Sequence, residues 1–158
     1  MLGKLEFIAN PGERTILMRR TFDAARTAVF EAWTTPEDVA LWWDPTGAPL
    51  AICEIDLRPG GTFRWVHQGD ADAKFPFTGV YREIAPPERL VFDLATSPMS
   101  PPHAATLKLD EQDGRTTLTI AIECASVEAR EALLAMRIDM GTARTLDNLA
   151  AHLARRPR

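Results

Sequence analysis

The chain has 158 residues, of which 46% are hydrophobic and 25% charged, and this composition suits one globular domain over residues 1–158. The formal net charge is -4, and the basic residues cluster only at the C-terminal tail, so the charge pattern disfavours nucleic-acid binding. No apolar run reaches the ~18 residues that a membrane span requires, and the N-terminus lacks the apolar core of a signal peptide. We therefore expect a cytoplasmic protein with no membrane span.

The two cysteines, Cys53 and Cys124, lie in or beside apolar runs and show no CxxC spacing. This pattern predicts free, buried thiols in a reducing compartment.

The first part of the chain predicts one strand followed by two short helices. Residues 1–12 are expected to form a loose lead-in, and a strand follows over about 15–21. A helix is predicted over about 26–34 with Asp23 as its N-cap. A second begins with Thr35 as N-cap and Pro36 as its first helical residue.

From residue 51 the apolar period changes to two, which predicts strands separated by Gly- and Pro-rich turns. Six strands are expected, over residues 51–58, 62–67, 77–84, 89–95, 104–110 and 115–123. Their short connections favour an antiparallel meander. Alternation along the last three strands predicts one apolar inner face, made by Leu90, Phe92, Leu94, Leu107, Leu109, Leu118, Ile120 and Ile122.

The last segment is predicted to be one amphipathic helix of roughly 25 residues, about 40 Å long, with Ser126 as its N-cap. Gly141 interrupts its apolar stripe and marks either a bend or a close approach to the sheet. The stripe steps by three or four residues through Ala129, Leu133, Met136, Met140, Ala143, Leu146, Ala150 and Leu153. The predicted fold class is therefore α+β, with the helix covering one face of the sheet.

Short motifs along the chain carry a family resemblance: residues 20–24 (RTFDA), 29–34 (VFEAWT), 42–43 (WW), 56–61 (DLRPGG), 79–84 (GVYREI), 87–92 (PERLVF) and 140–141 (MG). Together they resemble the Bet v1/START-like (SRPBCC) superfamily and, within it, the domain family of the activator of Hsp90 ATPase homologue 1, over a core of about residues 14–154. The resemblance implies a helix-grip fold: a seven-stranded curved antiparallel sheet in the order β-α-α-β6-α around a long C-terminal helix, with an internal, often apolar cavity.

One position departs from the family pattern. Many members continue with Gly-Pro after the position of Trp43, whereas this chain has Asp44-Pro45. An acidic residue there either alters the mouth of the cavity or is a simple turn residue.

Bulky side chains on the predicted strands are the candidates for lining the cavity. Phe63, Trp65 and His67 share one strand face, which we expect to point inward. Strand 77–84 is ambiguous, because one face carries Arg82 and the other Tyr81; Arg82 pairs either with an acidic side chain or with a polar group of a ligand. The candidate ligand-binding residues are Trp33, Trp42, Phe63, Trp65, His67, Tyr81, Arg82, Phe92, Met136 and Met140.

Catalytic signals are sparse. The sequence contains no HExxH, no GxSxG, no clustered metal ligands and no Gly-rich phosphate loop, so we predict no catalytic residue, no metal and no cofactor. His67 is the histidine placed near the expected cavity. It is interpreted as a satisfied or exposed side chain, with general acid–base chemistry alongside an Asp or Tyr81 as the alternative.

The leading functional hypothesis is binding of a small, mostly apolar molecule, either lipid-like or an aromatic metabolite, between sheet and C-terminal helix. One alternative is a cyclase- or hydrolase-type enzyme that uses the same cavity. Another, implied by the resemblance, is a domain that binds an Hsp90-like chaperone; these 158 residues do not include the separate N-terminal domain of the full-length activator, which argues against ATPase stimulation. The sequence also leaves open the possibility of a homodimer, since small domains of this kind can dimerise.

Overall fold

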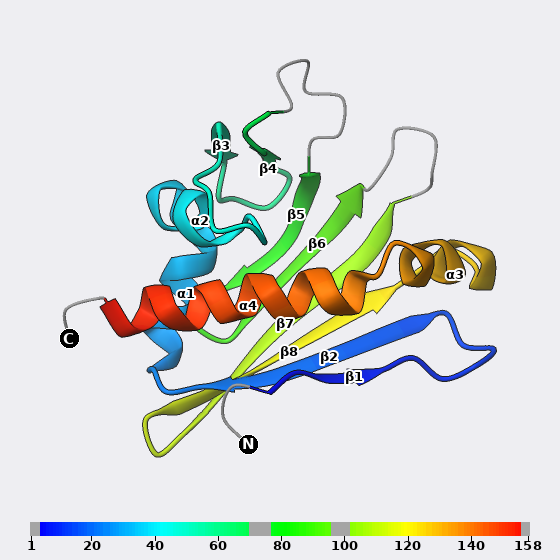
Figure 1. The fold of residues 1–158 in the computed structure, drawn as a ribbon, viewed down its shortest axis with the longest axis horizontal. Helices are drawn as coiled ribbons and strands as arrows, with labels where there is room; N and C mark the ends of the chain where they lie inside the picture. The colour runs from blue at the N-terminus through cyan, green and yellow to red at the C-terminus, as the bar shows by residue number, and fades with distance from the viewer. Residues whose placement is uncertain (1–3, 70–76, 96–101, 156–158) are drawn as a thin grey trace.

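The computed structural model describes residues 4–69, 77–95 and 102–155, and within these ranges it has eight strands and four helices (Figure 1). The strands are β1 (Glu6–Ile8), β2 (Thr15–Phe22), β3 (Ile52–Ile55), β4 (Thr62–Val66), β5 (Phe77–Ala85), β6 (Arg89–Ala95), β7 (His103–Gln112) and β8 (Arg115–Glu123). The helices are α1 (Arg26–Thr34), α2 (Pro36–Trp42), α3 (Val127–Ala135) and α4 (Ile138–Arg155).

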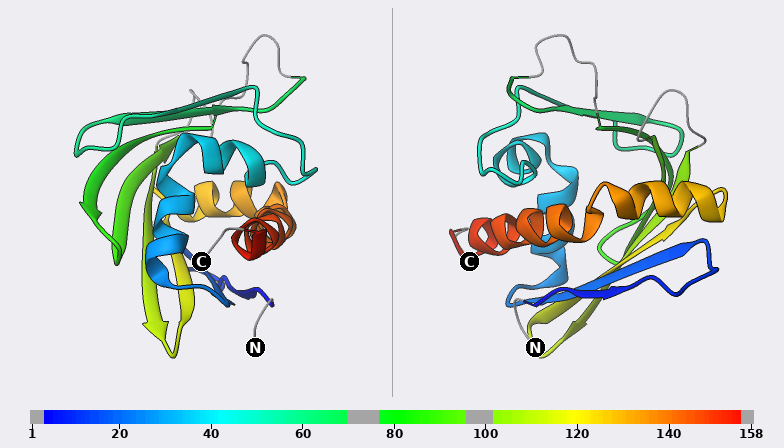
Figure 2. Two further views of the ribbon diagram at one scale, coloured as in Figure 1. Left: turned by 90° about the vertical axis from the view of Figure 1, so that its left-hand side faces the viewer. Right: turned by 45° about the vertical axis from the view of Figure 1, so that its right-hand side comes forward.

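The strands form one antiparallel sheet in the order β1-β2-β8-β7-β6-β5-β4-β3. The sheet curves around the helices, so that α1, α2 and α4 lie in its concave side (Figure 2). This is the predicted helix-grip arrangement, and the seven predicted strands and two short early helices are all present. None of the described helices has both the length and the apolar character that crossing a membrane requires.

The expectation of a loose lead-in over residues 1–12 was wrong for Glu6–Ile8. These three residues form β1, an edge strand paired antiparallel with β2 through Phe7 and Met18. A three-residue strand is too short for its alternation to be detected in the sequence. The sheet therefore has one strand more than predicted.

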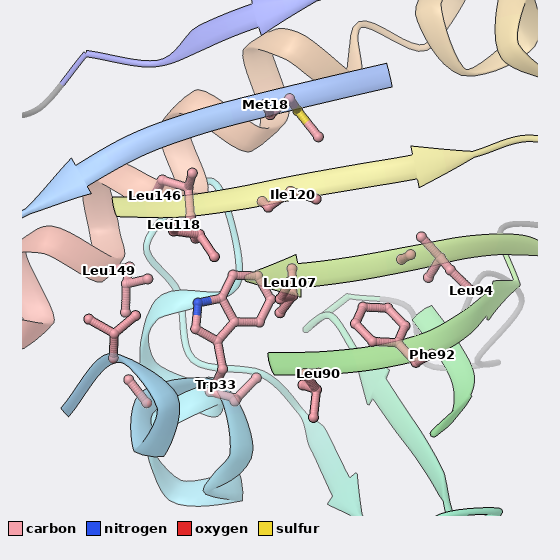
Figure 3. Close-up of a cluster of buried hydrophobic side chains, with 14 of the residues drawn as sticks. Met18, Trp33, Leu90, Phe92, Leu94, Leu107, Leu118, Ile120, Leu146 and Leu149 are labelled. Atoms are coloured by element: carbon pink, nitrogen blue, oxygen red, sulfur yellow. The ribbon is translucent and has the colours of Figure 1, made fainter. Parts of the chain in front are cut away.

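The inner face of the sheet follows the predicted alternation. Every second residue of β2 and of β8 is buried, and the same holds across β6. Figure 3 shows these side chains pointing into one interior, where Met18, Ile120, Leu107 and Phe92 come from four adjacent strands. At one end of this interior Leu146 and Leu149 of α4 meet Trp33 of α1.

The ambiguous strand β5 changes its inward-facing set at an irregularity between Tyr81 and Glu83. Gly79 and Tyr81 are buried before it, and Ile84 packs against the core after it. Arg82 falls at the irregularity, on the exposed side, where it pairs with Asp93 of β6. Because a bulge shifts the side-chain alternation by one residue, simple period-two reasoning could not assign both halves of this strand.

The predicted single C-terminal helix is wrong: α3 and α4 are separate helices. Ser126 caps α3 as expected, and its Oγ accepts a hydrogen bond from the backbone N–H of Ala129 at 3.0 Å. The break comes at Arg137, whose φ of 57° lies in the left-handed region that ends helices. Gly141 lies inside α4, and a Cβ added there would meet nothing within 4 Å, so neither the bend nor the close approach occurs at this glycine.

Helix N-caps were predicted with mixed success. The expected cap at Asp23 was wrong, since α1 begins after Ala25 and has no side-chain cap. Thr35 does occupy the N-cap position of α2 ahead of Pro36, although its side chain makes no capping hydrogen bond.

Polar contacts attach α4 to its neighbours. Thr145 Oγ1 donates to the carbonyl of Trp43 at 3.1 Å, and His152 Nε2 lies 2.9 Å from Asp38 Oδ1 of α2. On the sheet side, the buried Arg20 of β2 donates to Asp147 Oδ1 at 2.6 Å. These contacts fix the position of α4 over the sheet from Thr145 onward.

Candidate ligand-binding site

A cavity of about 460 Å³ lies between the inner face of the sheet and the junction of α3 with α4, and it is partly open to solvent. The sheet contributes the floor, α1 and the segment after α2 contribute one side, and the α3–α4 junction contributes the roof. Among the described residues, the lining consists of Met18, Trp33, Trp43, Pro45, His67, Phe77, Phe92, Leu94, Ala95, Ala105, Leu107, Ile120, Ile122, Leu133, Met136, Arg137, Ile138, Gly141, Thr142, Thr145 and Leu146.

Small side chains on opposite walls leave this space open. Ala105 lies in the floor between Phe92 of β6 and Ile122 of β8, its partners in the sheet register. Gly141 and Thr142 lie in the roof on α4. Larger side chains at these positions would fill the space, because protein interiors otherwise pack nearly without voids.

Aromatic rings build the wall near the end of β4. The Trp43 ring centroid lies 4.6 Å from that of Trp65 and 4.6 Å from that of Phe77. Phe63 lies 4.9 Å from Trp65 and completes the cluster. Trp43 and Phe77 face the cavity, whereas Phe63 and Trp65 support them without lining it.

A polar pair lies at the rim, where His67 follows β4 and Asp44 follows α2. His67 lines the cavity with 39% of its side chain exposed, and its Nδ1 lies 3.2 Å from Asp44 Oδ2. Asp44 is only 7% exposed, and its other oxygen, Oδ1, accepts from the backbone N–H of Thr46 at 2.9 Å and from the Thr46 hydroxyl at 2.8 Å. Asn148 of α4 donates to the Asp44 carbonyl at 2.8 Å.

These hydrogen bonds set the charge of Asp44. Burial by itself raises the pKa of a carboxyl group, but the bonds from Thr46 and His67 outweigh it and lower the pKa of Asp44 below its ordinary value. Asp44 is therefore a carboxylate at neutral pH. Asp44 is a turn residue bonded to Thr46, and it also contacts His67, which lines the cavity.

The family model described as activator of Hsp90 ATPase homolog 1-like protein matches residues 23–154. The chain belongs to this family. No curated protein sequence matches it significantly.

Solved structures agree with the assignment. A protein from Rhodobacter sphaeroides has a TM-score of 0.83 at 26% identity, covering 96% of this chain and 98% of its own. One from Nitrosomonas europaea has a TM-score of 0.79 at 25% identity, covering 92% and 97%. A protein from Mycobacterium smegmatis has a TM-score of 0.81 at 21% identity, covering 97% and 98%, and this likeness shows the fold alone. The helix-grip fold is thus confirmed.

In this family member, the candidates named from the sequence occupy three kinds of position. Those that line the cavity are Trp33, His67, Phe92 and Met136. Those that are buried in the core without lining it are Trp42, Phe63, Trp65 and Tyr81. Arg82 and Met140 are exposed and do not line it.

Local contacts and the break between α3 and α4 explain why some of the candidates do not line the cavity. Trp42 uses its indole N–H to bond the carbonyl of Ala32 at 2.9 Å inside the core. Burial raises the pKa of the Tyr81 hydroxyl well above its usual range, so this phenol is neutral in the core. Met140 was placed on the inner stripe by a continuous helix, and the break at Arg137 moves it to the outside.

Several lining residues were missed. Leu94, Ile120 and Ile122 had been assigned to the inner sheet face, but nothing in the sequence indicated that the helix leaves them uncovered. Ala105 carried no signal beyond that of an ordinary core residue. Trp42 and Trp43 were both expected near the mouth of the cavity, with at least one of them in the core; Trp42 is the core residue and Trp43 lines the cavity. The partner of His67 was anticipated only as an unspecified Asp, because Asp44 reaches it across a sequence separation of 23. Among the residues described, no group of three or more His, Cys, Asp or Glu is arranged to hold a metal ion.

Proposed function

We propose that this protein binds a small, mostly apolar molecule in the cavity beneath the α3–α4 junction. The observation that carries the proposal is the cavity itself, whose volume of about 460 Å³ falls within the roughly 300–1,000 Å³ usual for ligand pockets. Apolar side chains dominate its lining, and the polar groups His67, Arg137, Thr142 and Thr145 are few. An apolar lining with a small number of polar groups is the usual composition of such sites.

Water is a poor occupant of this space. A bound water needs two to four polar partners, and most of the floor consists of hydrocarbon side chains such as Leu94, Ile120 and Ile122. Exchange of that water for an apolar molecule removes hydrocarbon surface from water, which is favourable. The exposed Met136 at the roof adds a flexible, polarisable side chain that adapts to guests of different shape.

A cavity-filling substitution tests the proposal. The probe is N-phenyl-1-naphthylamine, whose fluorescence rises in an apolar environment. Ala105 is buried in the floor, so the ring introduced by Ala105→Phe should occupy the cavity and weaken probe binding at least ~10-fold. For the unsubstituted protein, saturating probe should also raise the melting temperature, because a ligand that binds only the folded state stabilises it.

The adjacent residue supplies the matched control. Ala104 precedes Ala105 on β7, and its side chain is exposed on the opposite face of the sheet. Ala104→Phe adds the same ring outside the cavity and should leave the dissociation constant within about twofold. The proposal is wrong if Ala105→Phe binds the probe as tightly as Ala104→Phe does. It is also wrong if the original protein neither raises the fluorescence of the probe nor melts at a higher temperature in its presence.

A further inference from the structure

The rim pair of His67 and Asp44 defines which kind of hydrogen bond the cavity offers. Asp44 is ionised, and a carboxylate can only accept hydrogen bonds. The hydrogen between Asp44 Oδ2 and His67 Nδ1, which are 3.2 Å apart, must therefore belong to Nδ1. In the neutral form of His67, the hydrogen on Nδ1 leaves Nε2 unprotonated, and that nitrogen is an acceptor.

The partner of Nε2 is not found in the part of the chain that the structure describes. The contact of His67 with Asp44 uses Nδ1, and the residue lines the cavity while 39% of its side chain remains exposed. The apolar neighbours Trp43, Pro45 and Phe77 line the same region and offer Nε2 no side-chain donor except the Trp43 indole.

Among the other polar groups in the lining, Arg137 and Thr145 are already hydrogen-bonded, and the Thr142 hydroxyl can both donate and accept, so it favours neither kind of ligand. The guanidinium of Arg137 donates to both carboxylate oxygens of Asp139, at 3.1 and 3.0 Å. The Thr145 hydroxyl donates to the carbonyl of Trp43. The Trp33 indole nitrogen is buried without a partner among the described residues, but it points toward Leu118 and Leu149, away from Phe92 (Figure 3).

We propose that His67 selects the ligand: its Nε2 accepts a hydrogen bond from a hydroxyl group, so the cavity prefers hydroxylated apolar molecules, such as phenols or apolar alcohols, over analogues without a donor. This inference rests on the proposed function. It also predicts discrimination against carboxylates, because an anionic ligand would approach both an acceptor nitrogen and the Asp44 carboxylate behind it.

A set of naphthalene derivatives separates the possibilities at pH 7.5, where a phenol is neutral. 2-Naphthol donates one hydrogen bond, 2-methylnaphthalene has nearly the same shape and donates none, and 2-naphthoic acid is an anion. We expect calorimetry or quenching of tryptophan fluorescence to show 2-naphthol binding roughly 3- to 10-fold more tightly than 2-methylnaphthalene. 2-Naphthoic acid should bind more weakly than either.

Two substitutions test the acceptor. His67→Phe keeps a planar ring and removes the nitrogen, so the preference for 2-naphthol over 2-methylnaphthalene should fall to within about twofold. Gln68→Phe, at the exposed next residue, is the matched control and should retain the preference.

The second substitution, Asp44→Asn, should change His67 from a hydrogen-bond acceptor into a donor toward the cavity. Thr46 donates twice to Oδ1, so the amide oxygen of the new side chain should stay there and its NH₂ should face His67 Nδ1. His67 would then carry its hydrogen on Nε2 and become a donor toward the cavity. 2-Methoxynaphthalene can accept a hydrogen bond but cannot donate one. We expect this variant to bind it roughly 3- to 10-fold more tightly than 2-methylnaphthalene, whereas the original protein should show no such preference.

The outcomes separate the two proposals. Equal affinity of the original protein for 2-naphthol and 2-methylnaphthalene overturns the role of His67 and leaves apolar binding in place. A preference for 2-naphthol that survives in His67→Phe also overturns it. If none of these compounds binds while N-phenyl-1-naphthylamine also fails, the cavity is not a binding site and both proposals are wrong.

Discussion

The two ends of the interior differ, although the same sheet forms the floor of both. At one end Leu149 of α4 and Leu118 of β8 are fully buried and do not line the cavity, and Trp33 and Leu146 lie between this end and the cavity. At the other end the sheet side chains Leu94, Ile120 and Ile122 face the α3–α4 junction across a cavity of about 460 Å³. Floor residues are apolar at both ends, so the difference comes from the small Ala105 in the floor and from the helices above it.

The attachment of α4 explains the contrast. From Thr145 onward, its side chains bond to Trp43, Asp44, Asp38 and Arg20, and these contacts hold that half of the helix close to the core. Before its first residue, Ile138, α4 is preceded by the left-handed Arg137 and the exposed Met136. A helix that is held at one end and interrupted at the other can combine a stable core with room for a guest.

The largest expected effect compares two leucines. Leu149→Ala removes a fully buried side chain from the packed end and should lower the free energy of unfolding by about 2–5 kcal/mol. Leu94→Ala enlarges the existing cavity. It should lower the free energy of unfolding by less, because part of the Leu94 side chain already lacks packing partners. Urea unfolding of both variants measures the difference; an equal or greater loss for Leu94→Ala would contradict the division into a packed and an open end.

Two glycines give effects of opposite sign. A Cβ at Gly79 would lie 2.5 Å from the Phe63 ring and 2.6 Å from the Asp93 carbonyl, so Gly79→Ala should destabilise the protein by about 1–3 kcal/mol. Gly141 has open space and lies in a helix, so Gly141→Ala should stabilise it by about 0.5–1 kcal/mol. Thermal unfolding reports both signs, and destabilisation by Gly141→Ala would indicate that the space around this glycine in the roof is not open.

The smallest effect is a pH dependence at the cavity rim. The pKa of Asp44 is lower in the folded protein than in the unfolded chain, so its ionised form stabilises the fold at pH values above the unfolded pKa of about 3.9. This contribution is lost as the pH falls through the folded-state pKa. Asp44→Asn should therefore melt at a lower temperature than the original protein at pH 7, and the gap should narrow below about pH 4.

Asp110→Asn is the control for this pH series, because Asp110 is exposed on β7. Its melting temperature should stay close to that of the original protein throughout. A gap between Asp44→Asn and the original protein that stays constant down to pH 3 would show that the hydrogen bonds at Asp44 do not depend on its charge.

Much of the fold was predictable because it depends on local patterns. Alternation identified the inner faces of β6, β7 and β8, and Gly- and Pro-rich turns separated the strands. The motifs from Arg20 to Gly141 indicated the family, which the match over residues 23–154 confirms. The bulge in β5 and the short β1 escaped prediction, since one shifts the period and the other is too short to show one.

The sequence by itself determined that an antiparallel sheet would present an apolar face to a C-terminal helical segment, because side-chain period and turn chemistry act over a few residues. Only the tertiary structure decided where that segment breaks and which side chains meet at the rim. A left-handed arginine at 137 has no sequence signal comparable to a glycine, and Asp44 and His67 come together only after α2 and β4 have packed. Both features depend on contacts between distant segments, and so does the cavity between them.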